Sequence, residues 1–349
     1  MFKDIQYTEI EDKKHHLLID VRSPNEYHEA TIPGAINIPL FDNEERALVG
    51  TVYKEKGSDI ARELGLEIVS PKIPQLVKQV RQALQPGQVP VFFCWRGGMR
   101  SKSMATFYSL IYPEPYRLEG GYRAYRQYIV EEIPKMDLNI PTFVLHGMTG
   151  VGKTTLLYKL KELGLSIIDL EGMAHHRGSA FGAIGLEPVN QKTFDSQVYE
   201  VLKEIRQARA VVIEAESKRI GKIIVPDNIM NAKEHGHHIL ITASQPIRIQ
   251  RILEEYRLDQ YKEPFIDGLK RIERKLPTEV RPLLFAAVEK NEFYQAIQLL
   301  LEYYYDPRYQ FATDQYQGPF FEVNSDNLDH AAREIVQYIE NKIVAFSLN

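Results

Sequence analysis

The sequence predicts an α/β protein with two parallel-sheet domains and a mainly helical C-terminal part. Three observations support this fold class. The chain has 349 residues, which is more than one hydrophobic core usually organises. Short continuous apolar runs recur in both halves, as the strands of buried parallel sheets do. Glycine-rich loops and helical patterns follow two of these runs, and alternation of strand and helix is typical of α/β folds.

Residues 1–134 are predicted to form the first domain. A strand from Leu17 to Val21 precedes a turn at Ser23-Pro24-Asn25, and the stretch with Pro33, Gly34 and Pro39 is expected to run loop, strand, loop. A helix at about 73–84 ends at "QPGQ", and "VPVFFCW" is a continuous apolar strand of a parallel sheet.

A linker is predicted at 135–141, where charges and the prolines Pro134 and Pro141 interrupt the apolar pattern. The second domain, 142–245, begins with strand, glycine loop and helix in "TFVLHGMTGVGKTTLLYKLKELG". The runs "SIIDLEG", "AVVIEAE" and "HHILITAS" supply its further strands. Residues 246–349 have helical periodicity, as in "RIQRILEEYR", and are expected to pack as a mainly helical part on this second domain.

Composition limits the class of protein. Hydrophobic residues make up 44% and charged residues 26%, and no apolar run approaches the roughly 20 residues that span a bilayer, so no membrane segment is expected. The start, "MFKDIQYTEIEDKK", lacks the apolar core of a secretory signal. The single cysteine excludes internal disulfides and cysteine-based zinc sites. These features favour the cytoplasm, and the net charge of -4 gives no general attraction to nucleic acid.

The stretch "GMTGVGKT" fits the phosphate-loop pattern G-x-x-x-x-G-K-[ST], with a strand before it and a helix after it. Its glycines let backbone amides surround a phosphate, the lysine adds a positive charge, and Thr154 can ligate Mg²⁺. Whether a nucleotide or another diphosphate binds is left open by the pattern. The predicted phosphate or diphosphate ligands are Gly147, Gly150, Gly152, Lys153, Thr154 and Thr155.

Acidic and basic residues follow the next strands. Glu214 and Glu216 end one strand where nucleotide hydrolases commonly carry a metal-binding aspartate, and Asp169 ends another. The unusual loop "EGMAHHRGSAFG" lies at the sheet edge where open α/β folds bind ligands. Adjacent histidines do not fit a zinc site. Solvated strand ends and a plain surface loop are the alternatives. The candidates for substrate or Mg²⁺ contacts are Asp169, Glu171, His175, His176, Arg177, Glu214 and Glu216.

The only cysteine, Cys94, is expected at a reactive position. It ends an apolar strand, and "WRGGMRSKSMATFYSLI" leads from it into a helix. Backbone amides, a helix N-terminus and the cations Arg96 and Arg100 favour an anion there, which lowers a thiol pKa and makes the sulfur a nucleophile. The alternative is a buried cysteine that acts as a small hydrophobe. Cys94, Arg96 and Arg100 are therefore the predicted catalytic residues.

The segment "LIDVRSPNEYHEATIPGAINIP", followed by this cysteine loop, resembles a rhodanese domain, a fold that carries sulfur as a cysteine persulfide. Five residues rather than the usual four separate Cys94 from Arg100. The C-x5-R spacing is that of rhodanese-like phosphatases, whose longer loop accepts a larger oxyanion. This resemblance implies a phosphorus-containing donor rather than thiosulfate.

The rhodanese-like domain, the phosphate loop and "DLEGMAHHRGSAFG" together resemble the tRNA 2-selenouridine synthase family over essentially the whole chain. The resemblance implies replacement of the sulfur of wobble 2-thiouridine in tRNA by selenium from selenophosphate, through an S-geranylated tRNA made with geranyl diphosphate. It implies that Cys94 takes selenium from selenophosphate or handles the sulfur leaving group, and it leaves open whether the selenium is carried as a perselenide. The phosphate loop could hold the diphosphate, with Thr154 as the candidate Mg²⁺ ligand. Haem, flavin and zinc are not expected, and a selenophosphate-producing enzyme is an expected partner.

Two basic groups are candidates for tRNA contacts, through phosphate pairing and, near Tyr116, Tyr122 and Tyr125, through base stacking. For the second group a solvated helix face is an equal alternative. The candidates are Arg117, Arg123 and Arg126, and then Lys270, Arg271 and Arg274 with Lys275.

Two other functions remain open from the residues. A sulfurtransferase or C-x5-R phosphatase coupled to an unrelated nucleotide loop predicts turnover without tRNA. A nucleotide-gated binding module with a sensor thiol predicts tight ATP binding and no RNA chemistry. The oligomeric state is not predicted.

Overall fold

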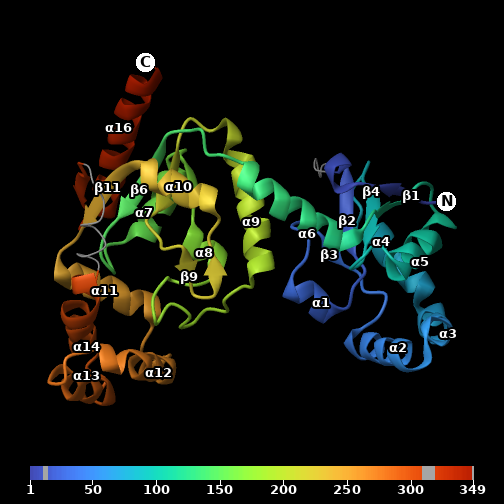
Figure 1. Ribbon diagram of the computed structural model, residues 1–349, viewed down its shortest axis with the longest axis horizontal. Coiled ribbons are helices and arrows are strands. Elements are labelled where there is room, and N and C mark those ends of the chain that lie inside the picture. The colour runs from blue at the N-terminus through green and yellow to red at the C-terminus, as the bar shows by residue number, and fades with distance from the viewer. Residues whose placement is uncertain (11–14, 309–318, 348–349) are drawn as a thin grey trace. The chain divides into compact units, whose positions relative to one another are not determined.

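The computed structural model describes residues 1–10, 15–308 and 319–347, which divide into two compact units (Figure 1). The first unit is Met1–Glu132 with Asp195–Gln197, and the second is Ile133–Phe194 with Val198–Asn349. Within the described ranges, no helix has both the length and the apolar character needed to cross a bilayer.

The first unit contains a five-stranded sheet of order β1-β5-β4-β2-β3, in which every neighbouring pair is parallel. Its strands are β1 (Lys3–Ile5), β2 (His16–Asp20), β3 (Ile36–Asn37), β4 (Val89–Phe93) and β5 (Tyr116–Leu118). Its helices are α1 (Pro24–Glu29), α2 (Asn43–Lys56), α3 (Ser58–Val69), α4 (Ile73–Ala83), α5 (Met99–Ser109) and α6 (Gly121–Glu132).

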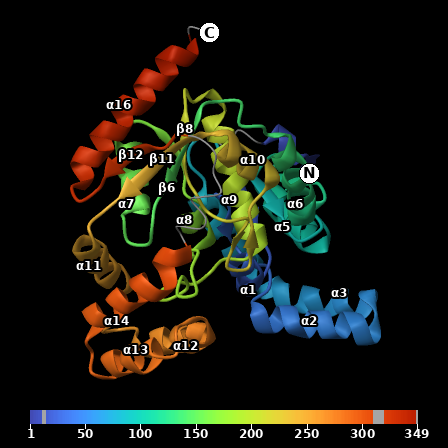
Figure 2. The same cartoon turned by 60° about the vertical axis from the view of Figure 1, so that its left-hand side comes forward.

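The buried core of this unit sits between the sheet and helices α4 and α5. Phe92 and Cys94 lie two residues apart, so their side chains share the face that packs on Val80 and Met104. Helices α2 and α3 lie side by side at one end of the unit (Figure 2). The core therefore fixes the end of β4, where the cysteine loop begins.

The second unit contains a five-stranded sheet of order β12-β11-β6-β8-β7, again parallel throughout. Its strands are β6 (Thr142–His146), β7 (Ser166–Ile168), β8 (Val211–Glu214), β11 (His237–Thr242) and β12 (Phe321–Asn324). A short antiparallel hairpin is formed by β9 (Arg219–Ile220) and β10 (Ile223–Ile224).

Helices cover this second sheet and extend beyond it. One face packs on α7 and α16 through residues such as Leu157 and Ile335, while α10 packs on β6. Further along the chain, α11 to α14 form a separate helical group with its own core, which includes Phe265 and Leu284 (Figure 2). The helices are α7 (Lys153–Glu162), α8 (Leu170–Ala174), α9 (Gln191–Glu204), α10 (Asp227–His235), α11 (Gln245–Tyr256), α12 (Lys262–Ile272), α13 (Val280–Glu289), α14 (Phe293–Leu300) and α16 (Leu328–Ser347).

The predicted fold class is confirmed, with three local corrections. The expected turn at Ser23-Pro24-Asn25 begins helix α1, because proline fits the first helical position and the Glu26 carboxylate accepts the Ser23 N–H at 3.2 Å. The expected loop after Asp169 begins with helix α8, which the Asp169 side chain caps by accepting the Gly172 N–H. The C-terminal part is not only helical, since β12 adds an edge strand to the sheet.

The division between the units falls after Glu132. Ile133 and Met136 are buried. The side-chain amide of Asn228 donates to the carbonyls of Ile133 and Met136, at 2.7 and 2.9 Å. Residues 133–136 are thus part of the second unit.

Candidate functional site

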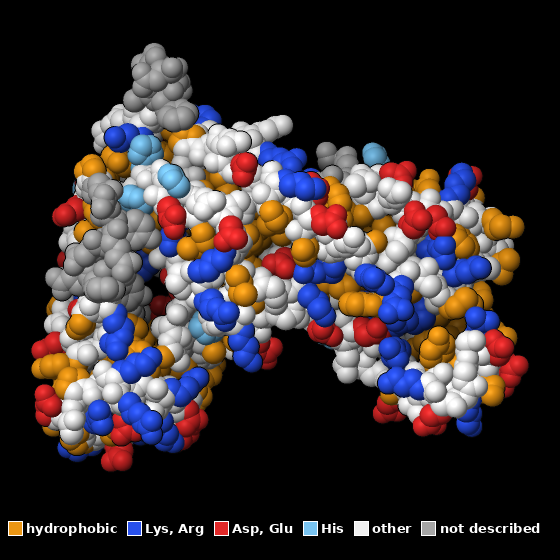
Figure 3. Space-filling view, in the orientation of Figure 1, with side chains coloured by type: hydrophobic (Ala, Val, Ile, Leu, Met, Phe, Trp, Pro, Cys, Tyr) orange, Lys and Arg blue, Asp and Glu red, His pale blue; other side chains and the backbone are white. Residues whose placement is uncertain are grey.

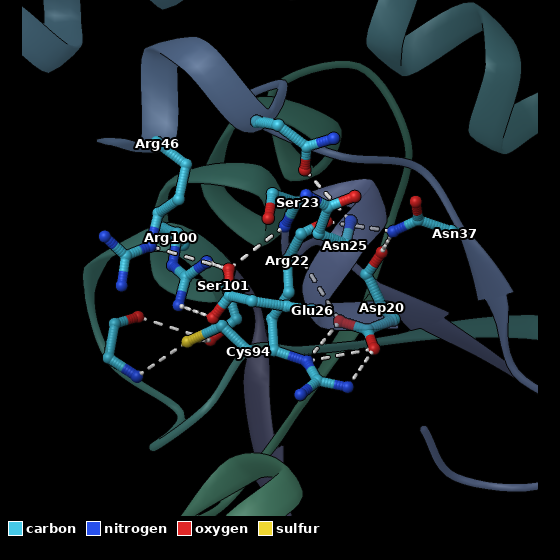
Figure 4. Close-up of polar contacts among 12 residues, drawn as sticks. Asp20, Arg22, Ser23, Asn25, Glu26, Asn37, Arg46, Cys94, Arg100 and Ser101 are labelled. Atoms are coloured by element: carbon cyan, nitrogen blue, oxygen red, sulfur yellow. Dashed lines mark hydrogen bonds and ion pairs between the residues drawn. The ribbon is translucent and has the colours of Figure 1, made fainter. Parts of the chain in front are cut away.

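The cysteine loop connects the end of β4 to the start of α5. The Gly98 N–H donates to the Cys94 Sγ at 3.2 Å, and the Ser101 hydroxyl lies 3.3 Å from the same sulfur (Figure 4). Cys94 is only 4% exposed. The loop is open at Gly98, where an added Cβ would meet no atom within 4 Å. The sulfur thus lies under a backbone amide and a hydroxyl, and both can stabilise a thiolate.

The shape of this loop depends on Gly97. Its φ is +63°, and a Cβ there would lie 2.8 Å from the Leu118 carbonyl oxygen. The start of α6 also holds the loop in place, because the Tyr122 N–H donates to the Cys94 carbonyl at 2.9 Å. The sequence therefore needs glycine at 97 both for the backbone angle and for the close approach of β5.

Arg100 is held by Glu26, a residue that the sequence analysis did not identify. Two of the three guanidinium nitrogens of Arg100 donate to the Glu26 carboxylate, at 2.5 and 3.1 Å, and Arg46 lies 3.5 Å from the same carboxylate (Figure 4). Burial alone would raise the Glu26 pKa, but the hydrogen bonds and charge of Arg100 lower it. The Arg100 pKa is raised, because these contacts outweigh burial. Arg96 is exposed. Glu26 therefore positions Arg100 beside the loop.

The phosphate loop has the same strand–loop–helix position in the second unit. It connects β6 to α7, and Gly147, Gly150 and Gly152 all have positive φ angles. The Lys153 ammonium donates to the Gly147 carbonyl at 2.9 Å, so the lysine reaches back across the loop. The Thr154 hydroxyl lies 3.4 Å from the Glu214 carboxylate, while Thr155 is exposed. The predicted phosphate ligands thus lie together on one loop directly before and within the first turn of α7, where a helix N-terminus favours an anion.

Three carboxylates gather beside this loop. Among the described residues, Glu171, Glu214 and Glu216 place one oxygen each within 4.8 Å of one another. Glu214 is fully buried, and its Oε1 has no hydrogen-bond partner in the described part of the chain. Burial and then the Glu216 charge raise the Glu171 pKa to about 8. Burial and then the Glu171 charge raise the Glu214 pKa.

A hard divalent cation would fit this carboxylate cluster. Mg²⁺ prefers oxygen ligands, and the cluster presents an unpartnered buried oxygen with Thr154 close by. A cation would also relieve the repulsion that raises both pKa values. The backbone of Gly178 comes close to the cluster, since a Cβ there would lie 2.7 Å from Glu216 and 3.0 Å from Glu171.

The other predicted residues of this edge have varied positions. Asp169 caps α8 and accepts the Tyr158 hydroxyl at 2.5 Å, which, with burial, raises the Tyr158 pKa to about 12. His175 ends α8 with a φ of +48° and is exposed. His176 is half-buried, and burial lowers its pKa. Arg177 donates to Glu255 at 2.5 Å, so it ties this loop to α11.

The sequence analysis also missed a histidine pair behind the phosphate loop. His146 Nε2 lies 2.8 Å from His238 Nδ1, on neighbouring strands. Burial, then the neighbouring His238, Lys233 and Lys153, lower the His146 pKa to about 3. The pair is therefore neutral at pH 7. The sequence gave no sign of this contact, because the two histidines are 92 residues apart.

The tyrosines predicted to stack on RNA bases near the cysteine loop include two that cannot do so. Tyr122 and Tyr125 are fully buried: Tyr122 contacts Trp95 and the Arg22 guanidinium, and Tyr125 contacts Tyr7. Two guanidinium nitrogens of Arg117 each donate to the Asp4 carboxylate at 2.7 Å, and Arg126 forms an ion pair with Asp195 at 2.8 Å. Arg123 is exposed.

The second basic group lies on the surface of the helical group. Lys270, Arg271 and Arg274 are exposed on α12 and the turn that follows it. Lys270 lies 3.2 Å from Asp267. In Figure 3 the helical group shows basic and acidic side chains side by side on its visible face.

Comparisons with known proteins agree with this arrangement. Residues 4–128 match the family model of the rhodanese-like domain, and residues 140–343 match that of the tRNA 2-selenouridine synthase AAA domain. Three similar curated proteins are all named tRNA 2-selenouridine synthase. The protein of Proteus mirabilis is 34% identical over 90% of this chain and 95% of its own length. The protein of Shewanella woodyi is 31% identical (86% and 89%), and that of Nitrosomonas europaea is 31% identical (93% and 82%). The resemblance found in the sequence is thereby confirmed, and the chain belongs to the tRNA 2-selenouridine synthase family of tRNA-modifying enzymes.

Proposed function

We propose that this enzyme geranylates the sulfur of wobble 2-thiouridine in tRNA with geranyl diphosphate, and then replaces the S-geranyl group with selenium from selenophosphate. The proposal is supported by the presence in one chain of two loops with different side-chain chemistry, each of which could bind an anion. One loop places a thiol under an amide, and the other places a lysine beside three carboxylates. The first supplies a nucleophile and the second a cradle for a leaving diphosphate.

The alkylation step is assigned to the phosphate loop. The thiocarbonyl sulfur attacks the first carbon of the geranyl group, and the carbon–oxygen bond breaks with its electron pair leaving on the diphosphate. The uridine N3 proton is lost to solvent or to a carboxylate. Lys153 and the loop amides would hold the leaving diphosphate, favoured by the N-terminus of α7. Mg²⁺ bound by Thr154 and the three glutamates would neutralise charge on the diphosphate.

The selenium step is assigned to the cysteine loop. The Cys94 thiolate attacks the phosphorus of selenophosphate, the phosphorus–selenium bond breaks, and selenide leaves with the electron pair. Selenide then adds to C2 of the S-geranylated uracil, and geranylthiol departs after taking up a proton. Water hydrolyses the cysteinyl phosphate and returns the thiol. Arg100, held by Glu26, would bind the phosphate oxygens.

Attack at phosphorus is preferred over direct transfer of selenium to the thiol as a perselenide. A perselenide would form only if phosphorus kept the electron pair of the broken bond and was itself reduced. Attack at phosphorus leaves both elements at their original oxidation levels. The C-x5-R spacing, suited to a phosphorus oxyanion, and the Ser101 hydroxyl at 3.3 Å from the sulfur support this route.

Substrate tRNA would be attracted by exposed basic residues. Arg123, Lys270, Arg271 and Arg274 are the surface candidates, whereas Arg117 and Arg126 would first have to give up their acidic partners. Binding through phosphates should weaken steeply with salt. We place the reaction in the cytoplasm with its tRNA substrate, and a selenophosphate-producing enzyme is the expected partner that supplies the donor.

The test is a nucleoside analysis by mass spectrometry of 2-thiouridine tRNA incubated with the enzyme, geranyl diphosphate and selenophosphate. We expect 2-selenouridine with both co-substrates, S-geranylated 2-thiouridine when selenophosphate is omitted, and neither product when geranyl diphosphate is omitted. Selenation without geranyl diphosphate, or no modified nucleoside with all components present, would contradict the proposal.

A second candidate function is hydrolysis of a phosphate monoester, because C-x5-R is followed here by a serine next to the sulfur. This alternative predicts that the enzyme releases phosphate from an aryl phosphate in the absence of tRNA. The Cys94→Ser variant should not release it. If the enzyme releases no phosphate from the aryl phosphate but does produce selenated tRNA, the phosphatase function is excluded.

A further inference from the structure

A short basic hairpin follows two of the three clustered carboxylates in the chain. Strand β8 ends at Glu214, and Glu216 lies two residues further on. The hairpin of β9 and β10 begins at Arg219, and Gly221 and Lys222 form its two-residue turn. The φ of Gly221 is +58°, an angle that tight hairpin turns commonly take at glycine. The sequence analysis did not single out this segment, which the chain itself ties to the carboxylate cluster.

The backbone of the hairpin is held firmly on the second unit. Ile220, Ile223 and Val225 are buried. The side-chain amide of Gln191, at the start of α9, accepts the Ile224 N–H at 2.8 Å and donates to the Ile224 carbonyl at 2.9 Å. This contact satisfies both backbone groups of an edge residue. Burial and hydrogen bonds therefore fix where the hairpin presents its side chains.

The turn of the hairpin also rests on His176, from the loop after α8. A Cβ at Gly221 would lie only 2.9 to 3.2 Å from atoms of the His176 ring. Two residues further along the same loop, Gly178 approaches the carboxylates, since a Cβ there would lie 2.7 Å from Glu216 and 3.0 Å from Glu171. The hairpin is thus joined to the carboxylate cluster both along the chain and through this loop.

The hairpin carries two positive charges that no acidic side chain compensates. Arg219 and Lys222 are exposed, and neither forms an ion pair within the part of the chain that the structure describes. Lys218, directly before the hairpin, is paired with Asp227. An anion can therefore bind Arg219 and Lys222 without displacing another group. Because the backbone beneath them is fixed, little conformational freedom is lost on binding.

This arrangement fits a polyanion better than a small anion. Both side chains are exposed to solvent, where single ion pairs are weak. A nucleic acid backbone presents a row of phosphates, so that several weak contacts act together. Because the chain belongs to a family of tRNA-modifying enzymes, tRNA is the polyanion that this surface has to accommodate.

We propose that the β9–β10 hairpin binds backbone phosphates of the substrate tRNA through Arg219 and Lys222, and so holds the RNA beside the carboxylate cluster. Phosphate contacts fix the register of a nucleic acid but do not read its bases. The hairpin is therefore a positioning surface. The inference requires only that the substrate is tRNA, and it is independent of which compound occupies the phosphate loop.

The test measures binding of labelled 2-thiouridine tRNA to the full-length enzyme by fluorescence anisotropy at a series of salt concentrations. The double variant Arg219→Gln/Lys222→Gln should bind about tenfold more weakly, or weaker still, at about 0.1 M salt. The slope of log affinity against log salt should fall by about 2, because each lost phosphate contact removes about 1. A tRNA without the 2-thio group should show the same loss, since phosphates carry no base information.

Lys54→Gln/Lys56→Gln is the matched control. Both lysines are exposed near the end of α2, and the variant has the same change in net charge. It should bind tRNA within about twofold of wild type, because salt screens charges that contact no phosphate. Equal losses in the two double variants would show a general effect of charge and overturn the proposal. An unchanged affinity and slope in the hairpin variant, or a loss confined to 2-thiouridine tRNA, would overturn it as well.

Discussion

The cysteine loop and the phosphate loop each follow the central strand of a five-stranded parallel sheet. The charged side chains around the two loops differ. At the first, Glu26 neutralises Arg100, and the group next to the amide is a sulfur. At the second, Lys153 reaches over the loop while three carboxylates gather beside it. In the proposed mechanism, the same strand–loop–helix order serves a nucleophile in one unit and, with a cation, a leaving group in the other.

The largest effect is expected from removing the nucleophile. Cys94→Ser should reduce selenation by about a thousandfold or more, because a hydroxyl in this setting is a far weaker nucleophile than a thiolate. Geranylation should stay within about twofold, since the alkylation is assigned to the other loop. Nucleoside mass spectrometry measures both, and an equal loss of both products would break the division between the loops.

The next largest effect is expected at the phosphate loop. Lys153→Ala should slow geranylation by about a hundredfold to a thousandfold, as removal of one charged stabiliser of a leaving group usually does. Alkylation of Cys94 by iodoacetamide in the same variant should keep its wild-type rate. A changed thiol reaction rate would mean that the loops are not independent.

The carboxylate cluster should make cation binding at the second loop depend on pH. Burial and then the Glu216 charge raise the Glu171 pKa from an ordinary value of 4.5 to about 8, so a Mg²⁺ ion bound by this carboxylate would displace its proton at neutral pH. Mg²⁺ affinity should rise by at least about tenfold per pH unit below that pKa, because the Glu214 carboxyl, whose pKa is also raised, would lose its proton as well. Calorimetry in buffers of different ionisation enthalpy would detect the released proton, and Glu171→Gln should flatten the dependence.

The same shift predicts how stability changes with pH in the absence of metal. A carboxyl whose pKa is raised by folding contributes stability that is fully present below pH 4.5 and is lost as the pH rises towards about 8. Metal-free protein should therefore lose stability across that window, and Glu171→Gln should lose less. Thermal unfolding at several pH values measures this, and a wild-type curve parallel to that of Glu171→Gln would contradict it.

The smallest effect separates two adjacent glycines of the cysteine loop. Gly97→Ala should destabilise the first unit by about 1–3 kcal/mol, because its φ of +63° and the Leu118 carbonyl at 2.8 Å both oppose a side chain. Gly98→Ala should cost under about 0.5 kcal/mol, since its φ is -88° and its surroundings are open. If denaturant unfolding shows that both variants lose the same free energy of unfolding, the backbone geometry of the loop is not the reason that glycine is needed at position 97.

Local patterns predicted the fold and the two loops well, because both depend on residues close together in sequence. The strand "VPVFF" and the glycine pattern at 147–154 specify their own structures. Contacts over long sequence separations were not predictable. Glu26 lies 74 residues from Arg100, and His146 lies 92 residues from His238. Tyr122 and Tyr125 were expected at the surface because the tyrosine–arginine pattern does not reveal which face of α6 is buried.

The claim that each loop performs its own step is tested most directly by supplying the intermediate. S-geranylated 2-thiouridine tRNA, with selenophosphate and no geranyl diphosphate, is given to Lys153→Ala and to Cys94→Ser, and the nucleosides are analysed by mass spectrometry. Our account predicts 2-selenouridine from Lys153→Ala at close to the wild-type rate, and none from Cys94→Ser. Failure of Lys153→Ala to selenate the supplied intermediate, or selenation of it by Cys94→Ser, would contradict the account.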